Sequence, residues 1–130
     1  MSNLHTTTAK ELYFSWINHV ENATTAEEIV SLYLDNSILI PTFSPDLCVN
    51  KQQKIDYFQN LLTKKNIKIT TEKLICQDSS ACLVCSGLYT FHYTDQNRRF
   101  SRSSRFTFIF KKIQDTAWQI LHHHSSELPN

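Results

Sequence analysis

The 130-residue chain is 41% hydrophobic and 19% charged, which is typical of a globular protein, and we expect one domain spanning residues 1–130. Its single glycine excludes the glycine-rich phosphate loops of P-loop and dinucleotide-binding proteins. Its net charge of +1 argues against nucleic acid as a partner.

Three helices are expected in the first half of the chain. Thr8 and Glu11 have the spacing of a capping box, and Thr25 and Glu28 repeat it. Apolar residues recur at three- and four-residue steps after each pair, as on one face of a helix. The expected ranges are residues 8–22, 24–34 and about 51–65.

Strands are expected in the rest of the chain. A short β-rich run, Ser-Ile-Leu-Ile, ends at Pro41, and four longer candidates follow the third helix. Short polar turns join these four, which favours antiparallel hairpins. The expected ranges are residues 67–77, 81–93, 100–112 and 117–126. Helices followed by strands, without βαβ alternation, indicate the α+β class.

One of these strands is apolar over part of both faces. Its two faces carry, respectively, Phe106, Phe108 and Phe110, and Arg105, Thr107 and Ile109. Three helices can cover one face of the sheet, and monomers rarely leave a large apolar patch exposed. We therefore expect a homodimer formed through the other face.

The cysteines and the hydropathy of the chain bear on its compartment. Cys82 and Cys85 form a Cys-x-x-Cys, but at this spacing on a strand their side chains point to opposite faces, which suits neither a redox motif nor a zinc site. The four cysteines are therefore expected to be free thiols in a reducing compartment, the cytoplasm. No apolar run approaches the ~20 residues of a membrane span, and the N-terminus has no signal-peptide core, so no membrane partner is expected.

Several stretches, taken in order, match a known family pattern. They are the first helix with Trp16, SLYLDNSILIPT, KIDYFQNLL, SGLYTF, SRFTFIFKK and WQILHHHSSELP. In these stretches the chain resembles the nuclear-transport-factor-2-like (NTF2-like or SnoaL-like) superfamily, and within it bacterial relatives of the calcium/calmodulin-dependent protein kinase II association domain. The resemblance implies a cystatin-like cone, with three helices packed on a strongly curved sheet that encloses a pocket. It also implies a homodimer, or a higher oligomer, built through the outer face of the sheet.

The resemblance further implies which side chains point into the pocket. One pocket arginine of the kinase domain matches Arg105, which would then point inward. The phenylalanines that alternate with it on the strand would then point outward. Two other pocket arginines fall on Gly87 and Ser125, so two of three positive charges are missing. Inward positions at Gly87 and Ser125 would bring Tyr89, Leu121 and His123 inward as well. The expected ligand-binding residues are Arg105, Tyr89, Tyr33, Trp16 and Ser125. The expected dimer-interface residues are Phe106, Phe108, Phe110, Trp118, His122 and His124.

The three consecutive histidines near the C-terminus have several interpretations. His123 inside a pocket could act as a general base or acid near pH 7, which makes it the candidate catalytic residue. Alternatively, His123 and Ser125 could satisfy each other as buried polar groups. Only His122 and His124 share a face, and no carboxylate accompanies them, so neither a metal site nor a cofactor is expected.

Three functional hypotheses follow. The first is a homodimeric domain that binds an anionic or carbonyl-bearing small molecule around Arg105, with or without turnover. The second is a SnoaL-like enzyme, of isomerase, cyclase or dehydratase type, that transfers a proton next to a carbonyl with His123 as the base. The third is a pure oligomerisation module. The substrate and the oligomer beyond a dimer do not follow from the sequence.

Overall fold

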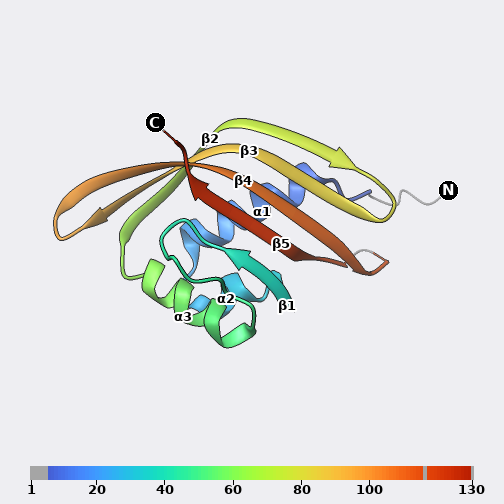
Figure 1. Cartoon of the computed structure of the whole chain (residues 1–130), viewed down its shortest axis with the longest axis horizontal. Coiled ribbons are helices and arrows are strands. Elements are labelled where there is room, and N and C mark those ends of the chain that lie inside the picture. The colour runs from blue at the N-terminus through green and yellow to red at the C-terminus, as the bar shows by residue number, and fades with distance from the viewer. Residues whose placement is uncertain (1–5, 116, 130) are drawn as a thin grey trace.

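The computed structural model describes residues 6–115 and 117–129, and it has the expected α+β class (Figure 1). Its elements in chain order are α1 (Ala9–Asn22), α2 (Ala26–Val30), β1 (Tyr33–Ile40), α3 (Lys51–Leu61), β2 (Lys65–Asp78), β3 (Cys82–Asp95), β4 (Arg98–Gln114) and β5 (Ala117–Glu127). No helix in this part of the chain is long and apolar enough to cross a membrane.

The helices begin at polar caps. The side chains of Thr8, Thr25 and Asn50 each accept a hydrogen bond from the backbone N–H three residues on, which satisfies one of the free donors of the first helical turn. The second helix is shorter than expected, because the chain enters β1 at Tyr33, which pairs with Ile120 of β5. Sheet pairing therefore overrides the helical periodicity of residues 24–34.

In the described residues the strands form one five-stranded sheet in the order β1-β5-β4-β3-β2. The strands from β2 to β5 are antiparallel neighbours, while β1 runs parallel to β5. The sheet curves over α1, and α2 and α3 lie together beside β1 (Figure 1). Gln96 and Asn97 make the β3–β4 turn with φ of 51° and 64°, the backbone of a two-residue hairpin turn that glycine often supplies.

Register between strands decides which side chains face the helices. Cys85, Phe108 and His123 lie opposite one another on β3, β4 and β5, and all three are buried. Tyr13 of α1 stacks on Phe106 with ring centroids 5.0 Å apart, and Trp16 meets Phe108 edge-on at 4.9 Å. This row therefore belongs to the inner face, which packs on α1 to form the core.

The predicted outward direction of the phenylalanines is wrong. Phe106, Phe108 and Phe110 are 4%, 0% and 2% exposed, so their rings form the core rather than an accessible interface. Because successive side chains of a strand alternate between faces, Arg105, which directly precedes Phe106, points to the outer face.

Candidate functional site

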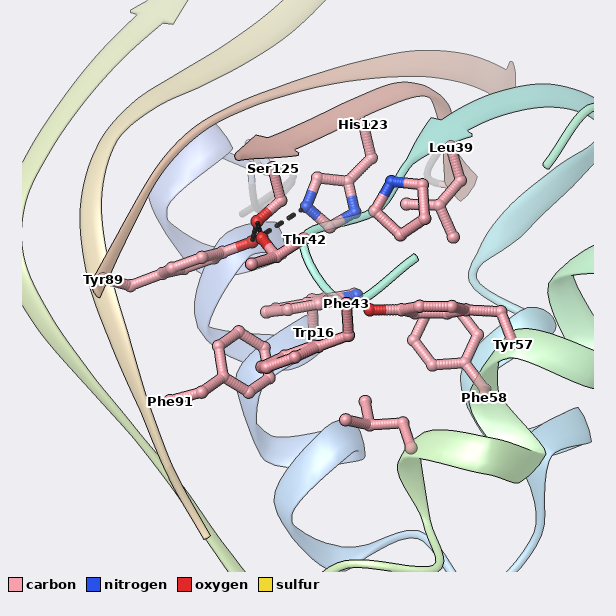
Figure 2. A pocket seen from close by; sticks show the side chains of 12 residues that line it. Trp16, Leu39, Thr42, Phe43, Tyr57, Phe58, Tyr89, Phe91, His123 and Ser125 are labelled. Carbon is pink, nitrogen blue, oxygen red and sulfur yellow. Dashed lines mark hydrogen bonds between the residues drawn. The ribbon is translucent and has the colours of Figure 1, made fainter. Parts of the chain in front are cut away.

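The candidate site is a small pocket inside the cone, between the sheet, α1, α3 and the segment 41–50 (Figure 2). Its twelve lining residues are Trp16, Leu39, Pro41, Thr42, Phe43, Tyr57, Phe58, Leu61, Tyr89, Phe91, His123 and Ser125. None of them carries a carboxylate, an ammonium or a guanidinium group. Polar groups of His123, Ser125, Thr42 and Tyr89 gather on one side of the pocket, and aromatic rings fill the other (Figure 2). The free space is about 10 Å³, roughly enough for the centre of one water molecule.

A chain of hydrogen bonds crosses the inside of the cone. The indole N–H of Trp16 donates to the Tyr33 hydroxyl at 3.0 Å, and that hydroxyl lies 2.8 Å from Nδ1 of His123. On the other side of the imidazole, Nε2 lies 3.2 Å from the Tyr89 hydroxyl, which donates to Ser125 Oγ at 2.7 Å. These contacts link α1, β1, β3 and β5 through one network of buried polar groups.

The direction of this chain follows from its first donor. Because an indole can only donate, Tyr33 accepts from Trp16 and has its own hydrogen free to donate to Nδ1 of His123. A neutral imidazole that accepts at Nδ1 carries its hydrogen on Nε2 and donates it to the Tyr89 oxygen. Tyr89 can then donate to Ser125, which is the direction that the geometry of that hydrogen bond gives independently.

The chain ends at the wall of the pocket. Ser125 Oγ lies 2.5 Å from Thr42 Oγ1, and Thr42 Oγ1 lies 3.2 Å from Ser104 Oγ. Because Ser125 accepts from Tyr89, its own hydrogen is free to donate to Thr42, and Thr42 can then donate its hydrogen to a further acceptor such as Ser104. Thr42 lines the pocket and Ser104 does not, so Thr42 offers the last hydroxyl of the chain next to the free space.

Burial keeps the imidazole of His123 neutral. The side chain is 2% exposed, and burial lowers its pKa well below the ordinary value, with the neighbouring His122 and His124 adding to the shift. The ring also stacks on Phe108 with centroids 3.8 Å apart, which leaves little room for the water that a charged form would need. The interior of the pocket is therefore uncharged.

Phe43 is one of the partly exposed residues of the pocket lining. It lies in the segment 41–50, which joins β1 to α3, and its half-buried ring meets Phe91 and Tyr93 edge-on at 5.5 and 5.8 Å. The ammonium group of Lys64 lies 5.9 Å from the Phe43 ring centre. Because the free space is about 10 Å³, a larger occupant requires side chains of the lining to move.

Several of the expected site residues meet in this pocket, and one lies elsewhere. Trp16, Tyr89, His123 and Ser125 line the pocket, and Tyr33 contacts it through His123. The predicted inward direction of Arg105 is wrong: Arg105 is exposed on the outer face and lines a separate open hollow of about 280 Å³ with Thr107, His124 and Ser126. Arg105 is paired with Ser126 of β5 and not with Ser125. Arg105 and Ser125 therefore point to opposite faces of the sheet, and the two cannot line the same pocket.

The other directional expectations have mixed outcomes. His122 and His124 lie opposite Ile109 and Thr107, on the outer face as expected, whereas the half-buried Trp118 packs against the core. Leu121 is 37% exposed, because the β4–β5 register shifts between Phe110 and Ile109 and leaves Leu121 without a partner. The expectation that Leu121 points inward is therefore wrong.

The backbone around Gly87 leaves no room for an arginine side chain at this position. A Cβ atom at Gly87 would meet the Lys73 carbonyl oxygen, next to the shift in the β2–β3 register. The single glycine of the chain thus permits a close approach of two strands.

Sequence reasoning did not assign to a site the six lining residues between β1 and the end of α3, which are Pro41, Thr42, Phe43, Tyr57, Phe58 and Leu61. Phe58 shows the helical periodicity of a core residue, which is a signal for burial but not for a site. Nothing in the local sequence marks Thr42 or Phe43, because their position depends on how the segment 41–50 folds over the sheet. In the described part of the chain, no three His, Cys, Asp or Glu side chains converge as metal ligands would.

Comparison with known proteins places the chain in a family. Residues 11–129 match the model of the calcium/calmodulin-dependent protein kinase II association domain, and the chain belongs to this family. A solved structure from Xanthomonas campestris, assigned to the same association domain, is similar at 26% identity and a TM-score of 0.86, over 98% of this chain and 99% of that one. No match is found among the curated proteins.

More distant structures share the fold. An NTF2-like protein from Streptomyces avermitilis, described as a dehydratase, is 10% identical with a TM-score of 0.81, over 95% of this chain and 96% of that one. A ketosteroid isomerase-like protein from Erwinia carotovora is 11% identical with a TM-score of 0.76, over 95% of each chain. The NTF2-like, cystatin-like cone expected from the sequence is thus confirmed.

Proposed function

We propose that this domain binds a small, uncharged, mostly apolar molecule that carries a carbonyl group, in the pocket between Trp16, Phe43 and Thr42. The observation that carries the proposal is the one-directional chain of hydrogen bonds that ends on Thr42 beside an otherwise apolar wall. A ligand carbonyl can accept the Thr42 hydrogen in place of Ser104, whose oxygen lies at 3.2 Å. Hydrogen bonds in series polarise one another, which makes the last hydroxyl a better donor.

The ligand class follows from charge and shape. An anionic ligand, the other possibility raised by the sequence, would enter an apolar cavity without a cation, and burying an unpaired charge is costly. The rings of Trp16 and Phe91 suit a flat apolar body instead. Among the similar folds, proteins described as an isomerase-like protein, a dehydratase and a hydroxylase support small-molecule binding in such a cone.

Hydrogen bonds at both ring nitrogens argue against His123 as a direct catalytic base. Tyr33 occupies Nδ1 at 2.8 Å and Tyr89 occupies Nε2 at 3.2 Å, so no lone pair of the ring faces the free space. The imidazole instead fixes the direction of the hydrogen-bond chain, which ends at the hydroxyl of Thr42. Binding, rather than proton transfer by His123, is the function that this geometry supports best.

Calorimetric titration with acetophenone tests the proposal, with benzoate as the anionic analogue of similar shape. For a ligand of this size we expect a dissociation constant on the order of 1 mM for acetophenone and no measurable binding of benzoate. In this proposal the Phe43 ring moves to admit the ligand, so Phe43→Ala should tighten acetophenone binding about tenfold by raising the fraction of open pocket.

Thr42→Val isolates the proposed hydrogen bond, because valine keeps the shape of threonine and removes its hydroxyl. We expect acetophenone binding to weaken about three- to tenfold, the effect of losing one neutral hydrogen bond. Thr107→Val, on the outer face of β4, is the matched control and should leave the affinity unchanged. Preferential binding of benzoate, or equal affinities for Thr42→Val and the wild type, would contradict the proposal.

For the assembly, we propose a homodimer through the outer face of the sheet. Val84, Ile109 and His122 lie opposite one another there, and Ile109 is only half-buried within one chain. Val84, Ile109 and the exposed Leu121 are the apolar residues of a strip that a second copy can cover. We expect light scattering at micromolar concentration to give the mass of two chains, and Ile109→Glu to give the mass of one. A wild-type mass of one chain would contradict the dimer.

A further inference from the structure

Two of the four free cysteines touch each other across neighbouring strands, away from the pocket. Cys76 of β2 and Cys85 of β3 are direct partners in the antiparallel ladder, and their sulfur atoms are 3.7 Å apart. The ladder is regular here, because the pairs on either side, Ile75 with Ser86 and Gln77 with Val84, keep the same register. Directly opposed residues of such a ladder have Cα atoms about 4.5–5.5 Å apart, within the range of about 4.4–6.8 Å that a disulfide spans.

The two thiols differ in how oxidants reach them. Cys76 is exposed on β2, which is the last strand at that side of the sheet, whereas Cys85 is fully buried on the inner face. Burial, and then the contact with Cys76, raise the pKa of the Cys85 thiol, so Cys85 keeps its hydrogen and lies 3.2 Å from the Ala9 carbonyl as its donor. The exposed thiol therefore reacts first and the buried thiol second.

The other cysteines are poorly placed to compete. Cys48 lies between β1 and α3, where it pairs with Leu39 in an isolated bridge. Cys82 is three residues before Cys85 on the same strand, so the two side chains point to opposite faces, and the Cys82 sulfur contacts the Ser79 hydroxyl at 3.9 Å. Contact, register and the difference in burial thus single out one pair.

We infer that Cys76 and Cys85 form a peroxide-responsive thiol pair that closes to a cross-strand disulfide. The Cys76 thiolate attacks one oxygen of hydrogen peroxide, breaks the O–O bond and becomes a sulfenic acid, while the other oxygen leaves and is protonated to water. The Cys85 sulfur then attacks the Cys76 sulfur, loses its proton and displaces the second oxygen as water. Two thiols are oxidised by two electrons, and one peroxide is reduced to two waters.

Closure changes how α1 is held. The Cys85 thiol and the Asp78 carboxylate both bond to Ala9, the first residue of α1, the carboxylate accepting from the Ala9 N–H at 3.1 Å. Oxidation removes the thiol hydrogen and with it the bond to the Ala9 carbonyl. The disulfide therefore acts at the start of the helix that carries Trp16 into the pocket.

Mass spectrometry of the full-length chain treated with hydrogen peroxide tests the inference. We expect the intact mass to fall by about 2 Da for the two hydrogens lost, and dithiothreitol to restore it. Peptide mapping should find the segments of Cys76 and Cys85 joined. Cys76→Ser, a replacement at an exposed position, should abolish the cross-link, and Cys82→Ser should leave it intact.

Three outcomes would overturn the inference. They are added oxygen on Cys76 without a cross-link, a cross-link that includes Cys82 or Cys48, and an unchanged mass under peroxide concentrations that oxidise exposed thiols. Because Cys76→Ser leaves the buried Cys85 in place, loss of the cross-link in this variant is separable from a failure to fold. Circular dichroism of the variant provides that check.

Discussion

Replacing Phe108 by alanine is expected to lower the free energy of unfolding by about 3–5 kcal/mol, the cost of emptying a phenylalanine site in a packed core. Phe108 is fully buried, and its ring contacts Tyr13, Trp16 and His123 at once. The variant would thus lose packing between α1 and the sheet as well as the stacking partner of His123. Urea unfolding followed by tryptophan fluorescence measures the loss.

Arg105→Ala is the matched control on the same strand. Its side chain is exposed on the outer face, so we expect a change within about 0.5 kcal/mol. The opposite result, a tolerated Phe108→Ala beside a strongly destabilising Arg105→Ala, would mean that β4 presents its other face to the helices. The pair of variants therefore tests the register on which the pocket depends.

His123→Leu is expected to destabilise the protein by about 2–4 kcal/mol at pH 7.5, because two buried tyrosine hydroxyls lose a hydrogen-bond partner each. Tyr33 would keep the bond from Trp16 but would have no acceptor at Nδ1, and Tyr89 would lose the donor at Nε2. His124→Ala, one residue away and exposed, should change the stability by less than about 0.5 kcal/mol.

The pH dependence of stability gives His123→Leu a second signature. The pKa of His123 is lowered in the folded protein, while the unfolded chain titrates near 6.5. Below that pH the unfolded chain binds a proton that the folded chain does not, so stability falls as pH falls, by up to about 1.4 kcal/mol per pH unit. The contribution of His123 to the free energy of unfolding is fully present above pH 6.5, and the variant His123→Leu lacks it.

Urea unfolding at pH 7.5 and at pH 5 checks this linkage. We expect the stability gap between the wild type and His123→Leu to narrow at pH 5, because only the wild type loses the His123 contribution. A gap of the same size at both pH values would mean that His123 titrates alike in the folded and unfolded chains. That result would contradict a neutral, buried imidazole at the centre of the site.

Sequence periodicity and turns predicted most of the elements, because capping pairs and alternation are local signals. Directions of side chains were harder, as Arg105 and Leu121 illustrate. A one-residue difference in register exchanges the two faces of a strand, and the bulge at Leu121 depends on pairing with β4 rather than on local sequence. The inward positions of Tyr89 and His123 were predicted correctly, whereas the phenylalanines of β4 were assigned to the wrong face.

The rest of the site depends on tertiary packing. The segment 41–50 has no periodic pattern, yet it supplies Thr42 and Phe43 to the pocket lining. Tyr33 was expected as a pocket donor, and its role as the link between Trp16 and His123 emerges only from the distances. A hydrogen-bond chain that crosses four elements has no counterpart in sequence spacing.

The most direct test of the account is a crystal of the wild-type protein soaked with 4-bromoacetophenone, in which anomalous scattering locates the bromine atom. We predict the aromatic ring against Trp16 and Phe91, in the space left by a displaced Phe43, with the carbonyl oxygen within hydrogen-bond distance of Thr42 Oγ1. Bromine in the outer hollow beside Arg105, with Phe43 not displaced, would contradict the proposed site.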